Sequence, residues 1–296
     1  MAHTFHGVWP ALVTPFTPDD EINTPVLRDL IQYLLGKGVD GFYVGGTTGE
    51  GVFMSAEERK QIIDAVLGEI DGRVPAIVHV GSMVYRDAVA LARHAEARGA
   101  VGVSSIVPPL FTSLDSLIAY FGAVAKAVPN LPVFPYFLSQ SIQPLELMRR
   151  LLDIPNIRGT KYTGPDMHEF RQIIELGGEA WTVFSGMDEV CVFAAMLGSN
   201  GNIGSTLNFM PGVYKHIRAH VERGEIDQAL ALQLRANHVT AVLLEGDLMG
   251  NLKAAMRLIG FDCGRPRLPR SGLDAPQTER LHAALKAVDF EALAAM

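Results

Sequence analysis

The chain has 296 residues, of which 48% are hydrophobic and 19% are charged, so it can bury a large core. Its formal net charge of −7 argues against nucleic-acid and anionic-membrane partners, because both select for clustered Lys and Arg. Residues 1–16 lack the pattern of a signal peptide, and no stretch approaches the roughly 20 apolar residues of a membrane span, so we expect a soluble cytoplasmic protein.

Short runs rich in β-branched and aromatic residues alternate with longer segments in which apolar residues recur every three or four positions. This alternation predicts strands joined by helices, and therefore a parallel sheet. Eight such units in roughly 220 residues close most economically as a (β/α)8 TIM barrel, with an open doubly wound sheet as the alternative. The strand-like runs are residues 7–13, 41–44, 75–80, 102–107, 131–136, 156–161, 181–185 and 200–205.

Two helix boundaries are marked by specific residues. Ser55 and Glu58 form the S-x-x-E pattern of a capping box, and Gly99 stands where the helix of residues 86–99 would end. Beyond Arg223 the composition is helical, apart from a polar, proline-containing turn near residues 264–276. These helices are too few to form an independent domain. We therefore expect a barrel at residues 1–223 and a C-terminal helical extension, residues 224–296, packed on it.

Residues 41–51 read GFYVGGTTGEG, which indicates a strand that ends in a flexible turn. Glycines let the backbone approach a ligand, and the hydroxyls of Thr47 and Thr48 add neutral donors, a set suited to a carboxylate. An ordinary turn between strand and helix is the alternative. A phosphate-binding P-loop is disfavoured because Glu50, not Lys, follows the glycine at position 49, and the G-x-G-x-x-G spacing of dinucleotide sites is absent.

Lys161 differs from the other lysines because it ends a strand-like run, IRGTK, at the expected mouth of the barrel. Desolvation there would disfavour the ammonium form and favour a nucleophilic amine, which an enzyme needs to form a Schiff base with a carbonyl substrate. A strand-end lysine that simply reaches solvent is the alternative. The other six of the seven lysines fall in helical patterns, where a solvated face is expected: Lys37, Lys60, Lys126, Lys215, Lys253 and Lys286.

Further polar and aromatic side chains are expected at the same end of the barrel. Tyr136 ends the fifth strand, where its phenol could pass protons as a general acid and base, although alone it would be a core aromatic. Asp188 and Glu189 follow the seventh strand, where they either stabilise a helix N-terminus or accept hydrogen bonds from hydroxyl groups. His79 is read as a hydrogen-bonded structural histidine.

The sequence contains no pattern typical of a metal site. His216 and His220 lie four residues apart without the H-E-x-x-H arrangement, and the spacing of Cys191 and Cys263 suits neither a disulfide framework nor a metal-ligand pair. We therefore expect no metal. The imine chemistry expected of Lys161 needs none.

The chain resembles the pyruvate-dependent Schiff-base aldolases, the family that includes N-acetylneuraminate lyase and dihydrodipicolinate synthase. The resemblance implies that Lys161 forms the imine, that Tyr136 transfers protons, and that Thr47 and Thr48 hold the pyruvate carboxylate. It also implies a homotetramer, and it implies no cofactor beyond the covalent imine. The matching motifs are GVWPALVTPF at 7–16, GFYVGGTTGEG at 41–51, IVHVGS at 77–82, RGTKYT at 158–163, FSGMDE at 184–189 and GNIGST at 201–206.

Within this family the chain is more similar to N-acetylneuraminate lyases than to dihydrodipicolinate synthases. The synthases have P-Y-Y where this chain has Phe111 after Pro109 and Leu110, and they have an arginine shortly after the fifth-strand tyrosine, which is absent here. The lyase subgroup usually has a proline-containing stretch after that tyrosine, where this chain has residues 137–140, FLSQ. The lyase resemblance implies polyol contacts from Gly186, Asp188, Glu189 and Ser205.

We therefore expect a carbon–carbon lyase that cleaves a sialic-acid-like 2-oxo acid to pyruvate and an aldehyde. One alternative keeps the imine and acts as an aldolase or dehydratase on a 2-keto-3-deoxy sugar acid. Another alternative condenses pyruvate with a semialdehyde, as dihydrodipicolinate synthase does. A barrel that binds a 2-oxo acid or sugar acid without turnover is the non-enzymatic alternative.

Overall fold

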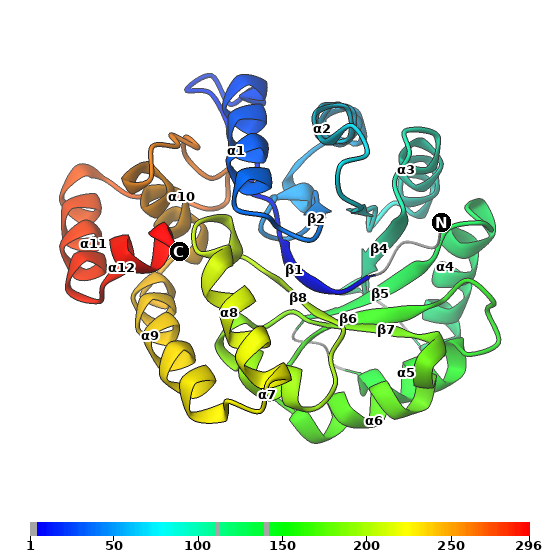
Figure 1. Cartoon of the computed structure of the whole chain (residues 1–296). Coiled ribbons are helices and arrows are strands. Elements are labelled where there is room, and N and C mark those ends of the chain that lie inside the picture. The colour runs from blue at the N-terminus through cyan, green and yellow to red at the C-terminus, as the bar shows by residue number, and fades with distance from the viewer. Residues whose placement is uncertain (1–4, 111–112, 139–141) are drawn as a thin grey trace.

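The computed structural model describes residues 5–110, 113–138 and 142–296 (Figure 1). Eight parallel strands form one sheet in the order β1-β8-β7-β6-β5-β4-β3-β2, and helices surround it. This arrangement confirms the predicted (β/α)8 barrel. The strands are β1 (Gly7–Pro10), β2 (Phe42–Val44), β3 (Ala76–His79), β4 (Gly102–Ile106), β5 (Val133–Leu138), β6 (Gly159–Thr163), β7 (Thr182–Ser185) and β8 (Gly201–Gly204).

The barrel closes just beyond the end of β1. Ala11 forms a parallel bridge with Tyr43 of β2, and Leu12 N donates to the Tyr43 carbonyl at 2.9 Å. The side chain of Asn208, from the turn after β8, holds the same segment: its Nδ2 donates to the Ala11 carbonyl at 2.7 Å, and its Oδ1 accepts from Val13 N at 3.1 Å. The first and last parts of the barrel are thus joined by side-chain as well as backbone hydrogen bonds.

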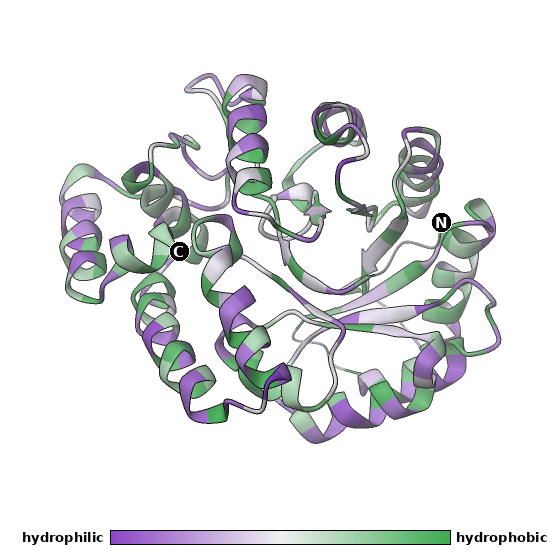
Figure 2. Ribbon diagram, in the orientation of Figure 1, coloured by the Kyte–Doolittle hydropathy of each residue, from purple (hydrophilic) through white to green (hydrophobic). Residues whose placement is uncertain are grey.

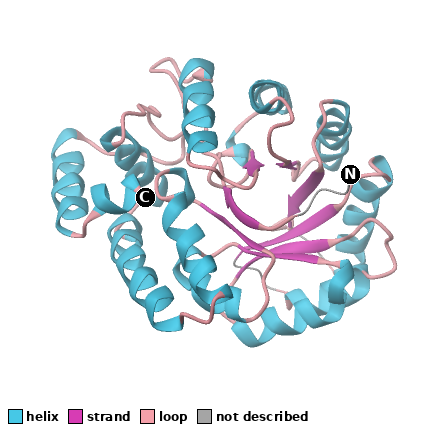
Figure 3. Ribbon diagram, viewed as in Figure 1, coloured by secondary structure: helices cyan, strands magenta, loops and turns pink. Residues whose placement is uncertain are grey.

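In the described part of the chain, eight helices follow the strands and cover the outside of the barrel, and four more form a C-terminal group in which α9 and α12 contact α8 (Figures 1 and 3). None of the helices in the described ranges combines the length and apolarity that crossing a membrane requires. The barrel helices are α1 (Thr24–Gly36), α2 (Ala56–Ile70), α3 (Tyr85–Ala97), α4 (Leu114–Ala127), α5 (Pro144–Leu151), α6 (Met167–Gly177), α7 (Cys191–Met196) and α8 (Pro211–Glu222), and the C-terminal ones are α9 (Ile226–Leu244), α10 (Leu248–Leu258), α11 (Ala275–Ala287) and α12 (Phe290–Ala295).

Both predicted helix boundaries are confirmed. Ser55 accepts from Glu58 N at 3.2 Å while the Glu58 carboxylate accepts from Ser55 N at 2.8 Å, which completes the capping box of α2. Gly99 follows α3 with a φ of +91°, in the region that favours glycine. Near the C-terminus, Asp289 has a φ of +59° and separates α11 from α12, which lets Phe290 and Leu293 turn into the core.

The apolar residues form two cores. The larger lies between the strands and the ring of helices, whose outward faces are hydrophilic (Figure 2). The smaller fills the barrel interior, where the ring of Phe184 lies 5.4 Å from that of Trp9 and 6.2 Å from that of Phe134. Aromatic side chains thus fill much of this interior, and the reactive positions of the fold lie at the carboxyl ends of the strands.

Candidate active site

A cavity of about 460 Å³ lies at the carboxyl ends of the strands. Its walls come from the carboxyl-terminal parts of β5, β6 and β8, from the segments after β2, β6, β7 and β8, and from the C-terminal helices α9 and α10. The structure brings together all the side chains and the glycine that the sequence singled out as site residues. These are Thr47, Thr48, Tyr136, Lys161, Gly186, Asp188, Glu189 and Ser205.

The amine of Lys161 lies between two aromatic rings. Lys161 on β6 is in register with Tyr136 on β5, and its Nζ lies 4.2 Å from the centroid of the Tyr136 ring and 4.6 Å from that of Tyr43. The side chain is only 5% exposed. The amine therefore lies in a nearly dry environment, which a carbonyl substrate can enter from the cavity.

Tyr43 forms part of this aromatic environment and was not singled out from the sequence. Its hydroxyl donates to Ser104 Oγ at 2.9 Å, and Ser104 Oγ donates to the Phe134 carbonyl at 2.8 Å. Burial, together with the neighbouring Tyr136, raises the pKa of Tyr43 well above its ordinary value. Tyr43 therefore remains neutral and fixed, with its ring close to the lysine amine.

The glycine-rich turn after β2 presents two threonines to the cavity. Gly45 has a φ of +68°, and a Cβ at Gly51 would lie 2.0 Å from the Gly45 carbonyl oxygen, so both positions require glycine. Thr14 Oγ1 donates to the Gly49 carbonyl at 2.7 Å and holds the turn from the β1 side. Thr48 Oγ1 lies 2.7 Å from Ser205 Oγ, which joins the turn to the segment after β8.

A buried ion pair anchors the same turn to the C-terminal region. Glu50, at a φ of +57°, forms an ion pair with Lys253, whose Nζ lies 2.6 Å from Oε1, and its Oε2 accepts from the backbone N of Arg267 at 2.8 Å. The Glu50 and Lys253 side chains are 0% and 1% exposed, so the expectation that Lys253 lies on a solvated helix face was wrong. Burial lowers the pKa of Lys253, and the Glu50 carboxylate opposes that effect. The inward face of α10 places this lysine against a turn about 200 residues earlier in the chain.

Asp188 lies in the short helical turn after β7 and is buried. Its Oδ2 accepts from Thr206 N at 2.9 Å and from Thr206 Oγ1 at 2.7 Å, whereas its Oδ1 has no hydrogen-bond partner among the described residues. Burial, reinforced by the adjacent Glu189, raises the pKa of Asp188 to about 6. The unpartnered oxygen is a buried acceptor that lies against Gly204, where a Cβ would leave it no room.

This pKa predicts a pH-dependent contribution to stability. The pKa of Asp188 rises from 3.8 to about 6 on folding, so the folded state binds this proton more tightly than the unfolded state does. The protonated carboxyl therefore stabilises the fold at low pH, and this stabilisation is lost as the pH rises from 3.8 to above 6. We expect wild type to lose about 1 kcal/mol of unfolding free energy, relative to Asp188→Asn, between pH 5 and 7.5. Urea unfolding of both proteins at the two pH values measures this, and the same pH dependence in both would contradict it.

Thr163 is a cavity residue that sequence reasoning missed. It lies two residues after Lys161 on β6, so the two side chains share a face of the strand, and its buried Oγ1 has no partner among the described residues. A Cβ at Gly186 would lie 1.8 Å from this oxygen and 2.9 Å from the Lys161 Cε. Because Gly186 has no side chain, the side chains of Thr163 and Lys161 can occupy this space. The two-residue period of the strand could have identified Thr163 from the sequence.

His79 is hydrogen-bonded inside the barrel, as expected. Its Nε2 accepts from Ile106 N at 3.0 Å, which assigns the proton to Nδ1, 3.2 Å from the Gly45 carbonyl oxygen. Burial and the positive charges of Arg59 and Lys161 hold the pKa of His79 well below its ordinary value. His79 is therefore neutral and packs the interior beneath the turn.

Some sequence positions cannot be placed in the site. Phe111, Ser139 and Gln140, which distinguish this chain from the two enzyme subgroups, lie outside the described residues. Among the described residues, no three or more His, Cys, Asp and Glu side chains gather closely enough to hold a metal ion.

Comparisons with known proteins give one consistent similarity. Residues 4–288 match the model of the dihydrodipicolinate synthetase family. The N-acetylneuraminate lyase of Rhizobium meliloti is 34% identical over 89% of this chain and 88% of its own length, and the mouse (Mus musculus) enzyme is 32% identical over 96% and 92%. The solved structure of Proteus mirabilis N-acetylneuraminate lyase superposes with a TM-score of 0.92 at 31% identity, covering 96% of this chain and 99% of that one.

Proposed function

We propose, from the premise that the chain belongs to the dihydrodipicolinate synthetase family, that it is a Schiff-base aldolase. It is a carbon–carbon lyase that cleaves a sialic-acid-like 2-oxo acid to pyruvate and an aldehyde, as the names of its N-acetylneuraminate lyase relatives suggest. The observation that carries the proposal is the position of Lys161. A buried amine faces the same cavity as two threonine hydroxyls and a tyrosine on the neighbouring strand.

The reaction begins when Thr47 and Thr48 hold the substrate carboxylate beside Lys161. The neutral amine attacks the C2 carbonyl carbon, and loss of water forms a protonated imine. In this scheme the Tyr136 phenol, on the strand next to Lys161, gives its proton to the departing water, and the resulting phenolate takes the proton of the C4 hydroxyl. The C3–C4 bond then breaks, its electron pair enters the imine as an enamine, and the aldehyde leaves.

The second half of the reaction releases pyruvate. The enamine takes a proton at C3, and water hydrolyses the imine to give pyruvate and the free Lys161 amine. No external cofactor enters this scheme, because the imine itself is the electron sink. Asp188, Glu189 and Ser205 line the cavity beside the β7 and β8 ends, where we assign them to the hydroxyl-bearing chain of the substrate.

Product analysis tests the proposed function. Incubation with N-acetylneuraminate is expected to release pyruvate and N-acetylmannosamine in equal amounts. A dehydratase acting on a 2-keto-3-deoxy sugar acid would release no free pyruvate. If calorimetry shows that the protein binds the 2-oxo acid but no product forms over several hours, the non-enzymatic alternative is favoured and the proposed function is wrong.

The carboxylate-binding role predicts a specific defect in Thr48→Val, which keeps the branched shape and removes the hydroxyl. Losing one hydrogen bond to a charged group is expected to raise the pyruvate concentration that half-saturates imine formation by about 10-fold or more. Borohydride trapping at graded pyruvate concentrations, read by intact mass, measures this. Thr278→Val, on α11 away from the cavity, is the matched control. Unchanged half-saturation in Thr48→Val would remove this threonine from the carboxylate site.

The proposal includes a cytoplasmic homotetramer, by resemblance to the family. Light scattering would then give about four times the chain mass of 32.1 kDa.

A further inference from the structure

One cation in the cavity wall has no role in the proposed reaction. Arg270 follows α10 and lines the cavity together with Leu244, Leu248 and Met249, which come from the C-terminal helices. The strands therefore supply the reacting groups, whereas the C-terminal region supplies a largely apolar wall that contains one guanidinium. Thr240 of α9 also lines this wall, but its hydroxyl donates to the Ala236 carbonyl at 3.1 Å. An apolar wall with a single directional donor is typical of a site that recognises a particular group on a ligand.

The guanidinium of Arg270 is held in place by the protein. Its Nη1 donates to Asp247 Oδ1 at 2.9 Å, and the same oxygen accepts from Met249 N at 3.2 Å at the start of α10. The ring of Phe53 lies 5.8 Å from the guanidinium carbon. These contacts come from two distant parts of the chain and fix the direction of the side chain.

Arg270 has unused hydrogen-bonding capacity. Its Nε is buried without a partner, and among the described residues its guanidinium donates only the Nη1 bond to Asp247. The side chain is nevertheless 28% exposed, so the exposed donors are those of the terminal nitrogens. Asp247 balances the positive charge, which leaves a directional donor suited to an uncharged oxygen as well as to an anion.

We propose that Arg270 is a specificity-determining residue that binds the acyl carbonyl of an acylamino group on the substrate, with the acyl methyl packed on Leu244, Leu248 and Met249. This inference rests on the proposed function. It selects acylamino sugar acids over the analogues that carry a hydroxyl at the same carbon. The chemistry of the wall matches an acyl group, which has one oxygen acceptor attached to a small apolar surface.

Two nine-carbon substrates that differ only at this group test the inference: N-acetylneuraminate and the 3-deoxy-nonulosonic acid with a hydroxyl in place of the acetamido group. In Arg270→Met, kcat/KM for the acylated substrate is expected to fall about 10- to 100-fold, because a hydrogen bond to a charged donor is lost. For the hydroxylated substrate the fall should be several-fold smaller. Arg270→Lys keeps a cation that can pair with Asp247 but lacks the planar guanidinium with its fixed donors. It should therefore show the same larger loss of kcat/KM for the acylated substrate in a protein that retains the ion pair.

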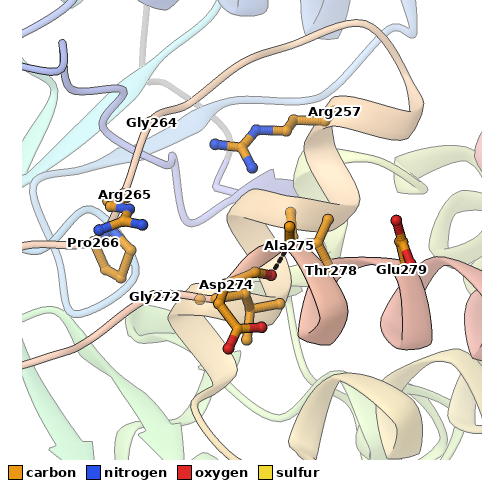
Figure 4. Close-up of a pocket in the computed structure, with 12 residues that line it drawn as sticks. Arg257, Gly264, Arg265, Pro266, Gly272, Asp274, Ala275, Thr278 and Glu279 are labelled. Carbon is orange, nitrogen blue, oxygen red and sulfur yellow. Dashed lines mark hydrogen bonds between the residues drawn. The ribbon is translucent and has the colours of Figure 1, made fainter.

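Arg257→Met is the matched control. Arg257 is also paired with an aspartate, Asp262, at 2.9 Å, but it lines a separate cavity of about 440 Å³ between α10 and α11 (Figure 4). This variant should leave both kcat/KM values unchanged. Equal losses for the two substrates in Arg270→Met and Arg270→Lys would overturn the inference while leaving the proposed function in place. If the wild-type protein cleaves neither substrate, the proposed function fails and the inference fails with it.

Discussion

Lys161→Ala is expected to abolish pyruvate release, with a fall in kcat of about 10⁴-fold or more, because the covalent route is lost. Lys161 is the one lysine of the described residues that lines the cavity, and its amine lies within 4.6 Å of two ring centroids. Removing it takes away both the nucleophile and the electron sink. A coupled assay for pyruvate measures the loss.

Lys161→Arg separates the nucleophile from its charge. Arginine can keep a cation between the Tyr43 and Tyr136 rings, but it stays protonated and cannot form the imine. We therefore expect it to be as inactive as Lys161→Ala. Lys126→Ala, an exposed position on α4, is the matched control and should retain full activity.

Borohydride reduction with pyruvate should add one pyruvyl group to wild type, in the peptide that contains Lys161. Pyruvate release at the wild-type rate from Lys161→Ala would contradict the mechanism.

Lys253→Met should produce the largest change in stability. The substitution leaves the carboxylate of Glu50 buried without its 2.6 Å partner, and breaking a buried pair in this way costs about 3–5 kcal/mol of unfolding free energy. Catalysis should also suffer, because Glu50 follows the turn that presents Thr47 and Thr48. Urea unfolding measures the first effect, and the half-saturating pyruvate concentration in borohydride trapping measures the second.

The double variant Lys253→Met with Glu50→Gln distinguishes a lost ion pair from a lost side chain. With the buried charge removed, much of the lost stability should return, since an uncharged pair carries a far smaller desolvation penalty. Lys126→Met changes a lysine on an exposed face and should shift the unfolding free energy by less than about 0.5 kcal/mol. A double variant as unstable as Lys253→Met would show that the ion pair is not the source of the effect.

Local sequence determined the architecture and much of the candidate site. Each of the eight strand-like runs forms a strand, because β-branched and aromatic side chains suit a sheet buried on both faces. A closed parallel barrel brings the carboxyl ends of its strands to one rim. Residues that end or follow strands, such as Thr48, Tyr136 and Lys161, therefore meet in space although the chain separates them widely. Periodicity and topology suffice for this convergence.

Only the tertiary structure decided how the C-terminal region completes the cavity. A helical pattern predicts that α10 has an inward face, but not which distant segment that face contacts, so Lys253 was expected in solvent and lies instead against Glu50. Arg270 had no local signal, since its position depends on Asp247 and on the way that α10 packs near the barrel mouth. Contacts between residues some 200 positions apart are set by packing of whole elements. Local patterns carry no information about that packing.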